Sequence, residues 1–159
     1  MKPLVTSARQ VGHARLRRTD DATKVGRVAR KALSILLADD DENLRVLITC
    51  WLQAAGHSVQ SAGTAKEAAL LFGTRKFDLV VTDILMPDGD GLELISHVKA
   101  GQPAPRILAI SGGGKYVEGD NCLKLARGWG AHAAVIKPFN REQLLAAVDL
   151  AFAPPVWCY

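Results

Sequence analysis

The 159-residue sequence has little cysteine, few aromatic side chains and no long apolar run. Its three cysteines, Cys50, Cys122 and Cys158, are widely spaced and have no CxxC or histidine partner at zinc-site spacing. Neither a disulfide framework nor a zinc site is therefore expected. The apolar stretches are far shorter than the roughly 18 residues that span a bilayer, and no apolar signal region follows the N-terminus. We expect a cytoplasmic protein without a transmembrane segment.

Positive charge is concentrated at the N-terminus, although the whole chain has a net charge of only +4. Residues 1–31 contain nine basic and two acidic residues, a net charge of +7, whereas the remainder contains 11 basic and 14 acidic residues, a net charge of −3. Because the first segment has few large apolar residues, burial cannot offset its ordering entropy. We expect a flexible basic extension over 1–31, a folded domain over 32–153 and a short tail over 154–159. A solvated extension is favoured over contact with an acidic partner, such as nucleic acid or anionic lipid, and over a transit peptide.

Strand and helix patterns alternate through the folded part. Residues 32–38 form an unbroken apolar run that ends in three aspartates, and from Leu44 to Ala55 apolar residues recur at helical spacing. Capping boxes open two later helices at Thr64 and Asn140. The expected strands cover 32–38, 58–62, 77–82, 106–110 and 133–136, and the expected helices cover 44–55, 64–72, 92–100, 117–128 and 140–152. This alternation predicts an α/β fold, a doubly wound parallel sheet of five strands, with ligands bound at the carboxyl ends of the strands.

Polar side chains stand where the predicted strands end. They are Asp39 and Asp40 after the first strand, Asp83 after the third, Ser111 after the fourth and Lys137 after the fifth. Three converging carboxylates would repel one another, and a hard cation relieves this repulsion; without nearby histidine or cysteine, Mg²⁺ is favoured over zinc. Ser111 and Lys137 could then bind the oxygens of a transferring phosphoryl group while a free carboxylate attacks phosphorus.

Four short segments surround the polar residues at the predicted strand ends. They are Ile35–Glu42 (ILLADDDE), Asp83–Gly91 (DILMPDGDG), Ala109–Gly112 (AISG) and Lys137–Phe139 (KPF). Together they resemble the receiver domains of two-component response regulators of the chemotaxis-regulator type, whose phosphoacceptor loop reads DxxMPxxDG. The resemblance covers about residues 33–152 and occurs in the familiar order and spacing. It implies the flavodoxin-like strand order 2-1-3-4-5 and a cis peptide between Lys137 and Pro138.

The resemblance also implies a role for each site residue. Asp83 would accept the phosphoryl group, Asp39, Asp40, Asp83 and the backbone carbonyl of Leu85 would bind Mg²⁺, and Ser111 and Lys137 would bind phosphoryl oxygens. The donor would be a phosphohistidine on a sensor histidine kinase or a histidine phosphotransfer protein, and the target an unidentified protein. Such a chain is a signalling phosphoacceptor that assists its own phosphorylation and dephosphorylation rather than an enzyme. Because the chain stops soon after the last predicted helix, we expect a single-domain regulator without a DNA-binding domain.

Two departures from the family pattern carry expectations. Ala134 stands three residues before the lysine, where the family often has an aromatic residue that swings inward, so partner recognition would rely on other changes or on a neighbouring side chain. Leu85 stands two residues after Asp83, and Gly113 stands two residues after Ser111. In the family, the side chains at these two positions influence how a water molecule approaches the phosphoryl group. Since neither side chain can orient a water molecule, slow self-dephosphorylation is expected.

Two other functional hypotheses remain beside this one. A receiver-like interaction module could act through protein contacts without being phosphorylated. A small serine hydrolase is the weaker hypothesis: Ser111 stands in a sequence close to a nucleophile elbow, and Asp120 and His132 follow it in the order of a catalytic triad. The hydrolase hypothesis leaves the acidic cluster unexplained.

Overall fold

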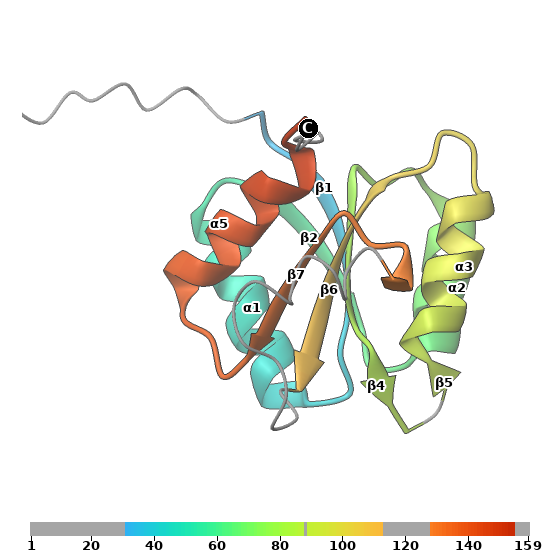
Figure 1. The fold of residues 1–159 in the computed structure, drawn as a ribbon, viewed down its shortest axis with the longest axis horizontal. Helices are drawn as coiled ribbons and strands as arrows, with labels where there is room; N and C mark the ends of the chain where they lie inside the picture. The colour runs from blue at the N-terminus through green and yellow to red at the C-terminus, as the bar shows by residue number, and fades with distance from the viewer. Residues whose placement is uncertain (1–30, 88, 113–127, 155–159) are drawn as a thin grey trace, which may run out of the picture. The chain divides into compact units, whose positions relative to one another are not determined.

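A parallel sheet of five strands forms the centre of the structure, a computed structural model that describes residues 31–87, 89–112 and 128–154. The strand order is β2-β1-β3-β6-β7, which confirms the predicted flavodoxin-like arrangement (Figure 1). The strands are β1 (Ser34–Ala38), β2 (Ser58–Ala62), β3 (Leu79–Asp83), β6 (Arg106–Gly112) and β7 (Ala133–Lys137). A separate antiparallel pair, β4 (Leu85–Met86) and β5 (Gly89–Asp90), lies in the loop after β3.

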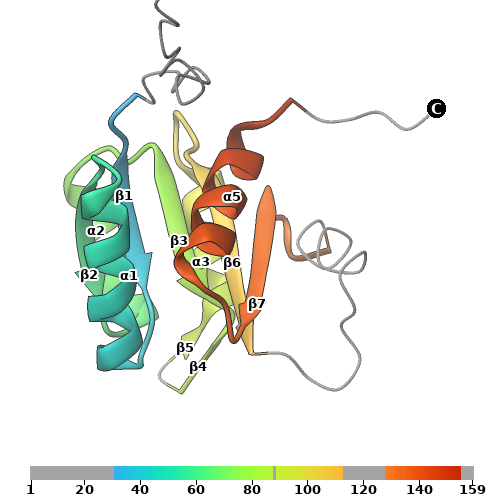
Figure 2. The same cartoon turned by 90° about the vertical axis from the view of Figure 1, so that its left-hand side faces the viewer.

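Helices cover both faces of the sheet, as a doubly wound fold requires (Figures 1 and 2). They are α1 (Glu42–Ala54), α2 (Ala65–Thr74), α3 (Gly91–Ala100) and α5 (Arg141–Phe152). Alternate strand residues enter two core clusters: Leu36 and Val80 pack on the side of α2 and α3, whereas Ile35 and Val81 pack on the side of α1 and α5. Burial on both faces explains why the predicted strands have continuous apolar runs instead of alternating ones.

Local capping interactions start the helices where the sequence predicts, within two residues. The Asp41 carboxylate accepts hydrogen bonds from the backbone N–H groups of Asn43 and Leu44 at 2.9 and 3.1 Å, so α1 begins at Glu42, two residues before the predicted start. Both halves of the capping box at Asn140 are formed. The predicted helix over 117–128 lies, except for its last residue, outside the described residues.

The two strands that border the predicted site are longer than expected. β6 continues through Ser111 to Gly112 and β7 includes Lys137, because their pairing extends through Ser111 opposite Ile136 and Gly112 opposite Lys137. These two residues therefore belong to the ends of strands rather than to the loops after them. The Lys137–Pro138 peptide is cis as expected, and so is Gln102–Pro103.

The predicted extension and tail are described only at Lys31 and Pro154. The division of the chain into two parts falls between Lys31 and Ala32. The flexibility of residues 1–31 stays a prediction. In the described part of the chain, no helix is long and apolar enough to cross a bilayer.

Candidate phosphoacceptor and metal site

Three aspartates from two neighbouring strands meet at the carboxyl edge of the sheet. One carboxylate oxygen from each of Asp39, Asp40 and Asp83 lies within 4.8 Å of the others. Asp39 and Asp83 are buried, whereas Asp40 is exposed. β1 and β3 are paired in parallel, so Ala38 and Thr82 lie side by side and the aspartate after each is carried to the same place. The convergence predicted for these three residues is confirmed.

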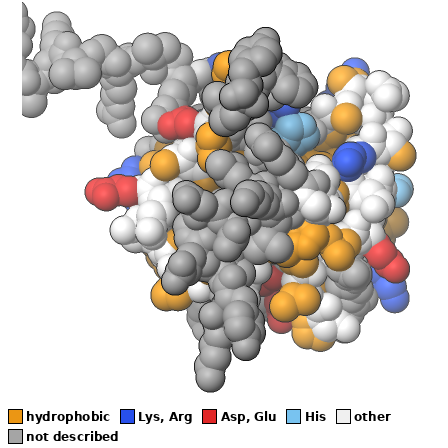
Figure 3. Space-filling model, in the orientation of Figure 1, with side chains coloured by type: hydrophobic (Ala, Val, Ile, Leu, Met, Phe, Trp, Pro, Cys, Tyr) orange, Lys and Arg blue, Asp and Glu red, His pale blue; other side chains and the backbone are white. Residues whose placement is uncertain are grey.

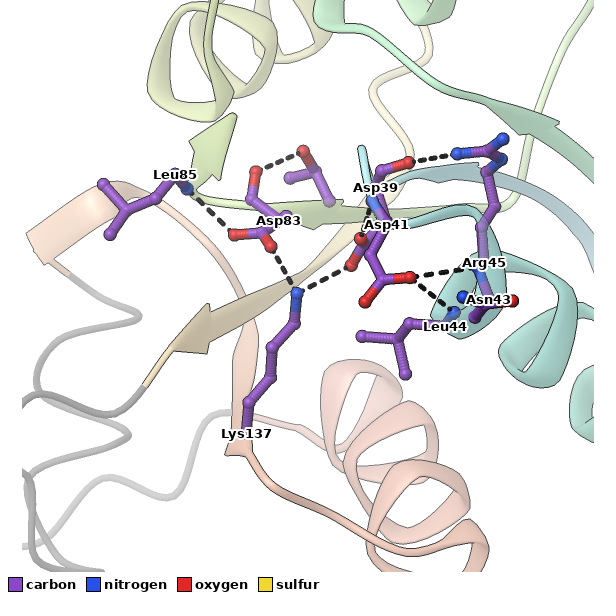
Figure 4. Close-up of polar contacts among 9 residues, drawn as sticks. Asp39, Asp41, Asn43, Leu44, Arg45, Asp83, Leu85 and Lys137 are labelled. Atoms are coloured by element: carbon purple, nitrogen blue, oxygen red, sulfur yellow. Dashed lines mark hydrogen bonds and ion pairs between the residues drawn. The ribbon is translucent and has the colours of Figure 1, made fainter. Parts of the chain in front are cut away.

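Lys137 reaches this cluster from β7 (Figure 4). Its Nζ donates a hydrogen bond to Oδ2 of Asp83 at 2.5 Å and lies 3.0 Å from Oδ2 of Asp39. The second contact is an ion pair with a carboxylate oxygen that is buried. One ammonium group thus partly neutralises two buried carboxylates.

The pKa values of Asp39 and Lys137 are both raised, but for different reasons. Burial raises the pKa of the Asp39 carboxyl, and the nearby Lys137 ammonium offsets only part of this effect. Burial alone would lower the pKa of Lys137, but its contacts with Asp83 and Asp39 outweigh burial and raise that pKa. At neutral pH the lysine is therefore positively charged.

The loop that carries Asp83 is held by backbone contacts. Oδ1 of Asp83 accepts a hydrogen bond from the Leu85 N–H at 2.9 Å, and the Ile84 N–H donates to Ile110 O on β6 at 2.9 Å. Helix α3 approaches so closely that a Cβ on Gly91 would lie 2.0 Å from Asp83 O. The glycine of the motif therefore allows the start of α3 to pack directly against the aspartate backbone.

Leu85 leaves a large apolar side chain exposed beside the acidic cluster, since 72% of its surface is accessible. In the space-filling view, acidic and apolar side chains are neighbours at the lower edge of the molecule, below the carboxyl ends of the strands (Figure 3). The backbone nitrogen of Leu85 faces the Asp83 carboxylate in Figure 4. Whether its carbonyl binds a metal stays a prediction.

Strand register places Ser111 beside the cluster. Asp83 pairs with Ile110 on β6, and Ser111 is the next residue on that strand. On the other side of β6, Ser111 pairs with Ile136, which precedes Lys137. Ser111 therefore lies at the same edge of the sheet as Asp83 and Lys137. Its role as a ligand of a phosphoryl oxygen rests on the resemblance.

Of the residues at which the sequence departs from the family pattern, Ala134 lies in the described part of the chain and Gly113 does not. Ala134 is partly buried against the core cluster on the side of α2 and α3, and Trp129 packs against the same cluster. Gly113 lies outside the described residues. The packing on this face does not contain the aromatic side chain that the family often places on β7.

The hydrolase hypothesis is wrong because its serine and histidine lie at opposite ends of the sheet. Ser111 is near the carboxyl end of β6, whereas Nδ1 of His132 accepts a hydrogen bond from the Ile107 N–H near the start of that strand, at 3.0 Å. The intended base therefore cannot reach the serine. The third member, Asp120, lies outside the described residues.

The sequence analysis overlooked Arg45, which also contacts the site. Its Nη1 donates a hydrogen bond to the backbone carbonyl of Asp39 at 2.7 Å. The sequence does indicate the position of Arg45, because a residue four positions after Asp41 lies on the same face of the helix and its side chain tilts toward the loop before the helix.

The donor set fits a hard divalent cation. Three carboxylates supply oxygen ligands, and the buried Oδ2 of Asp39 has no hydrogen-bond donor among the described residues to satisfy it. Magnesium is commonly bound by one or two carboxylates and keeps several waters, which the exposed position of Asp40 permits. The cluster is thus consistent with the acidic metal site of a receiver domain.

A family model described as the response regulator receiver domain matches residues 35–149. The chain belongs to this family. The receiver domain is similar to the DNA-binding transcriptional regulator NtrC of Azospirillum brasilense, with 34% identity over 120 residues that cover 76% of this chain and 24% of that protein. It is also 33% identical over 119 residues to the transcriptional regulatory protein RprY of Bacteroides fragilis, covering 74% of this chain and 48% of that protein. The chain therefore spans about a quarter to a half of these relatives.

Solved structures of receiver domains have the same fold. The chemotaxis response regulator CheY4 of Vibrio cholerae superposes with a TM-score of 0.67 at 25% identity, covering 76% of this chain and 99% of that one. A response regulator receiver domain protein of Clostridium thermocellum superposes with a TM-score of 0.63 at 28% identity, covering 74% of this chain and 92% of that one. Receiver domains generally act in signalling rather than as enzymes, and the acidic cluster found here is typical of their phosphoacceptor site.

Proposed function

We propose that this receiver domain accepts a phosphoryl group on Asp83 from a phosphohistidine and signals through contacts with another protein. The donor would be a sensor histidine kinase or a histidine phosphotransfer protein. The observation that carries the proposal is the position of Asp83, a buried carboxylate that lies within 4.8 Å of two further carboxylates and is hydrogen-bonded to Lys137. An isolated surface aspartate would have neither neighbour.

Mg²⁺ is the proposed cofactor. Asp39, Asp40, Asp83 and the carbonyl of Leu85 would hold it, and the carboxylate cluster supports the first three assignments. When bound, the ion would supply positive charge to the oxygens of the incoming phosphoryl group. This charge would also relieve the repulsion among carboxylates that Lys137 offsets only in part.

The residues of the chain would assist transfer mainly by position and charge. A carboxylate oxygen of Asp83 would attack phosphorus as the bond from phosphorus to the donor imidazole nitrogen breaks, leaving an acyl phosphate and a neutral histidine after protonation. Lys137 would then bind a phosphoryl oxygen in place of Oδ2 of Asp83, and Ser111 would donate to a second one. The Leu85 N–H keeps the other carboxylate oxygen of Asp83 oriented in the resting site.

Mg²⁺-dependent labelling by a small phosphodonor tests the proposal. The full chain is incubated with phosphoramidate, with and without Mg²⁺, and intact mass spectrometry measures the addition of one phosphoryl group. Asp83→Asn should fold but not label, whereas the matched change Asp149→Asn, at an exposed position on α5, should label as the wild type does.

Two outcomes would overturn the assignment. Labelling of Asp83→Asn at the wild-type rate and site would exclude Asp83 as the acceptor. A folded wild-type protein that takes up no phosphoryl group with Mg²⁺ present would instead support the interaction module that acts without phosphorylation.

A further inference from the structure

We propose that Arg45 is a positioning residue for the metal site, which it serves by fixing the peptide that joins Asp39 to Asp40. This inference rests on the proposed function, because it concerns the same Mg²⁺ site. Arg45 touches neither the phosphoacceptor nor its lysine, and its guanidinium lies on the far side of Asp39 from Lys137 in Figure 4. An influence of Arg45 on the orientation of the metal ligands would therefore pass through the backbone of Asp39, whereas its charge acts on the metal through space.

The guanidinium of Arg45 is held by one hydrogen bond and lies beside a glycine. Its Nη1 donates to Asp39 O at 2.7 Å, and a Cβ built on Gly63 would lie 3.4 Å from the same nitrogen and 3.7 Å from Cζ. The absence of a side chain on Gly63 thus leaves room for the guanidinium beside the loop after β2. Its backbone is equally fixed, since Arg45 N donates to Asp41 O at 2.8 Å in the first turn of α1.

The contact restrains the part of the loop that aims the two proposed ligands. The carbonyl of Asp39 belongs to the peptide plane whose nitrogen is that of Asp40, so fixing this oxygen limits the direction of the exposed Asp40 side chain. Two other contacts hold Asp39 itself: its N–H donates to Ala62 O at 3.2 Å, and its Oδ1 accepts from Asp41 N at 2.9 Å. The Arg45 contact is the one that acts on the peptide between the two ligands.

Charge and position make opposite predictions for the loss of Arg45. A cation near the cluster repels Mg²⁺, so removal of its charge alone would strengthen metal binding. Loss of an outer contact that orients a metal ligand typically weakens binding about 10- to 100-fold. A rise in the Mg²⁺ Kd therefore indicates a positioning role, and a fall indicates a purely electrostatic one. A general loss of stability predicts neither change at a temperature where the variant is folded.

Isothermal titration of the full chain with Mg²⁺ alone provides the test. Arg45→Met keeps much of the aliphatic stem and should raise the Mg²⁺ Kd about tenfold or more. Lys66→Met removes the same charge from an exposed position in the first turn of α2 and should leave the Kd unchanged or slightly lower. Arg45→Lys keeps the charge with a shorter reach and should have an intermediate Kd.

A second variant displaces the guanidinium without removing it. Gly63→Val places methyl groups against the Arg45 guanidinium and should also raise the Mg²⁺ Kd, so the inference remains testable if Arg45→Met does not fold. Unchanged or tighter binding in a folded Arg45→Met variant, or in Gly63→Val, would overturn the positioning role while the proposed function stands. A wild-type protein that binds no Mg²⁺ would overturn both.

Discussion

Lys137 Nζ lies 2.5 Å from Oδ2 of Asp83, so the end of β7 is joined to the end of β3 across the intervening strand β6. The same ammonium is 3.0 Å from the buried carboxylate of Asp39, the residue that follows β1. A single side chain thereby connects the carboxyl ends of three strands. Because this contact compensates buried negative charge, both the stability of the metal-free protein and its response to Mg²⁺ should depend on it.

Lys137→Met should destabilise the metal-free protein, because it leaves two buried carboxylates without their cation. The expected loss is about 2–3 kcal/mol of unfolding free energy, below the ~3–5 kcal/mol for a fully buried pair because the Lys137 side chain is 26% exposed. Urea denaturation with and without Mg²⁺ measures this loss, part of which Mg²⁺ should restore. Lys76→Met, at an exposed position, is the control and should change stability little. An equal stability for Lys137→Met and wild type would show that the contact contributes nothing.

Asp40→Asn should raise the thermal stability of the metal-free protein and weaken Mg²⁺ binding. Asp40 is exposed, so the relief of repulsion from Asp39 and Asp83 is modest, and we expect a gain below about 1 kcal/mol. The change of a charged carboxylate into a neutral amide, which keeps one oxygen but loses the negative charge, should raise the Mg²⁺ Kd. Thermal melts and Mg²⁺ titration test the two effects separately. A Kd equal to that of the wild type would contradict a metal-binding role for Asp40.

The fold could be predicted because the sequence expresses it locally. Residues 35–38 are apolar in succession since both faces of β1 are covered, and Asn140 with Gln143 marks the start of α5 within a single turn. The convergence of Asp39, Asp40 and Asp83 also followed from one rule, that parallel strands end at one edge. Each of these predictions depends on neighbours in sequence or on topology alone.

Other features depended on contacts between distant segments and could not be predicted. Pairing with β7 extends β6 through Ser111, although Ser111 and Gly112 have no apolar pattern of their own. The spacing of Arg45 from Asp41 indicates that its side chain lies near the loop before α1, but it does not indicate that the guanidinium donates to the Asp39 carbonyl. Tertiary geometry thus determined the ends of the strands and the supporting contacts of the site.

His132 should make the stability of the protein depend on pH. Its Nδ1 accepts the Ile107 N–H, and the partial desolvation of this exposed residue, with smaller contributions from Arg106 and Lys99, lowers its pKa from the ordinary 6.5. Because the folded-state pKa is lower than the unfolded one, His132 contributes stability above pH 6.5 that is lost as pH falls through the folded-state pKa.

Urea denaturation between about pH 7 and pH 5 measures this effect against the unfolded value. His132→Asn retains a hydrogen-bond acceptor that does not titrate there, so its unfolding free energy should fall less steeply with pH than that of the wild type. His97→Asn, an exposed position on α3, is the control and should keep the wild-type slope. A slope for His132→Asn as steep as that of the wild type would exclude His132 as the titrating group.

Deletion of residues 1–31 should leave the melting temperature and the phosphodonor labelling nearly unchanged. The reason is compositional: this segment has a net charge of +7 and few large apolar residues with which to pack. Thermal melts and intact mass measurements compare the shortened and full chains. A large drop in melting temperature would show that the segment packs on the domain, and salt-sensitive DNA or vesicle binding that disappears on deletion would support an acidic partner.

Leu85→Asn should shorten the lifetime of the acyl phosphate on Asp83. Hydrolysis requires water to attack phosphorus as the bond to the Asp83 oxygen breaks. An oriented hydrogen-bonding group near the site can assist that attack, and positioned general bases increase the rate of related reactions about 10²–10⁴-fold. Leu85 is 72% exposed beside Asp83, and we expect its apolar side chain to shield a phosphoryl group on Asp83 without orienting a water. Loss of the phosphoryl mass with time, at fixed Mg²⁺, gives the half-life of each protein. Leu70→Asn makes the same change at a position on α2 that is 74% exposed and should decay as the wild type does, whereas a Leu85→Asn half-life equal to or longer than wild type would refute the shielding role.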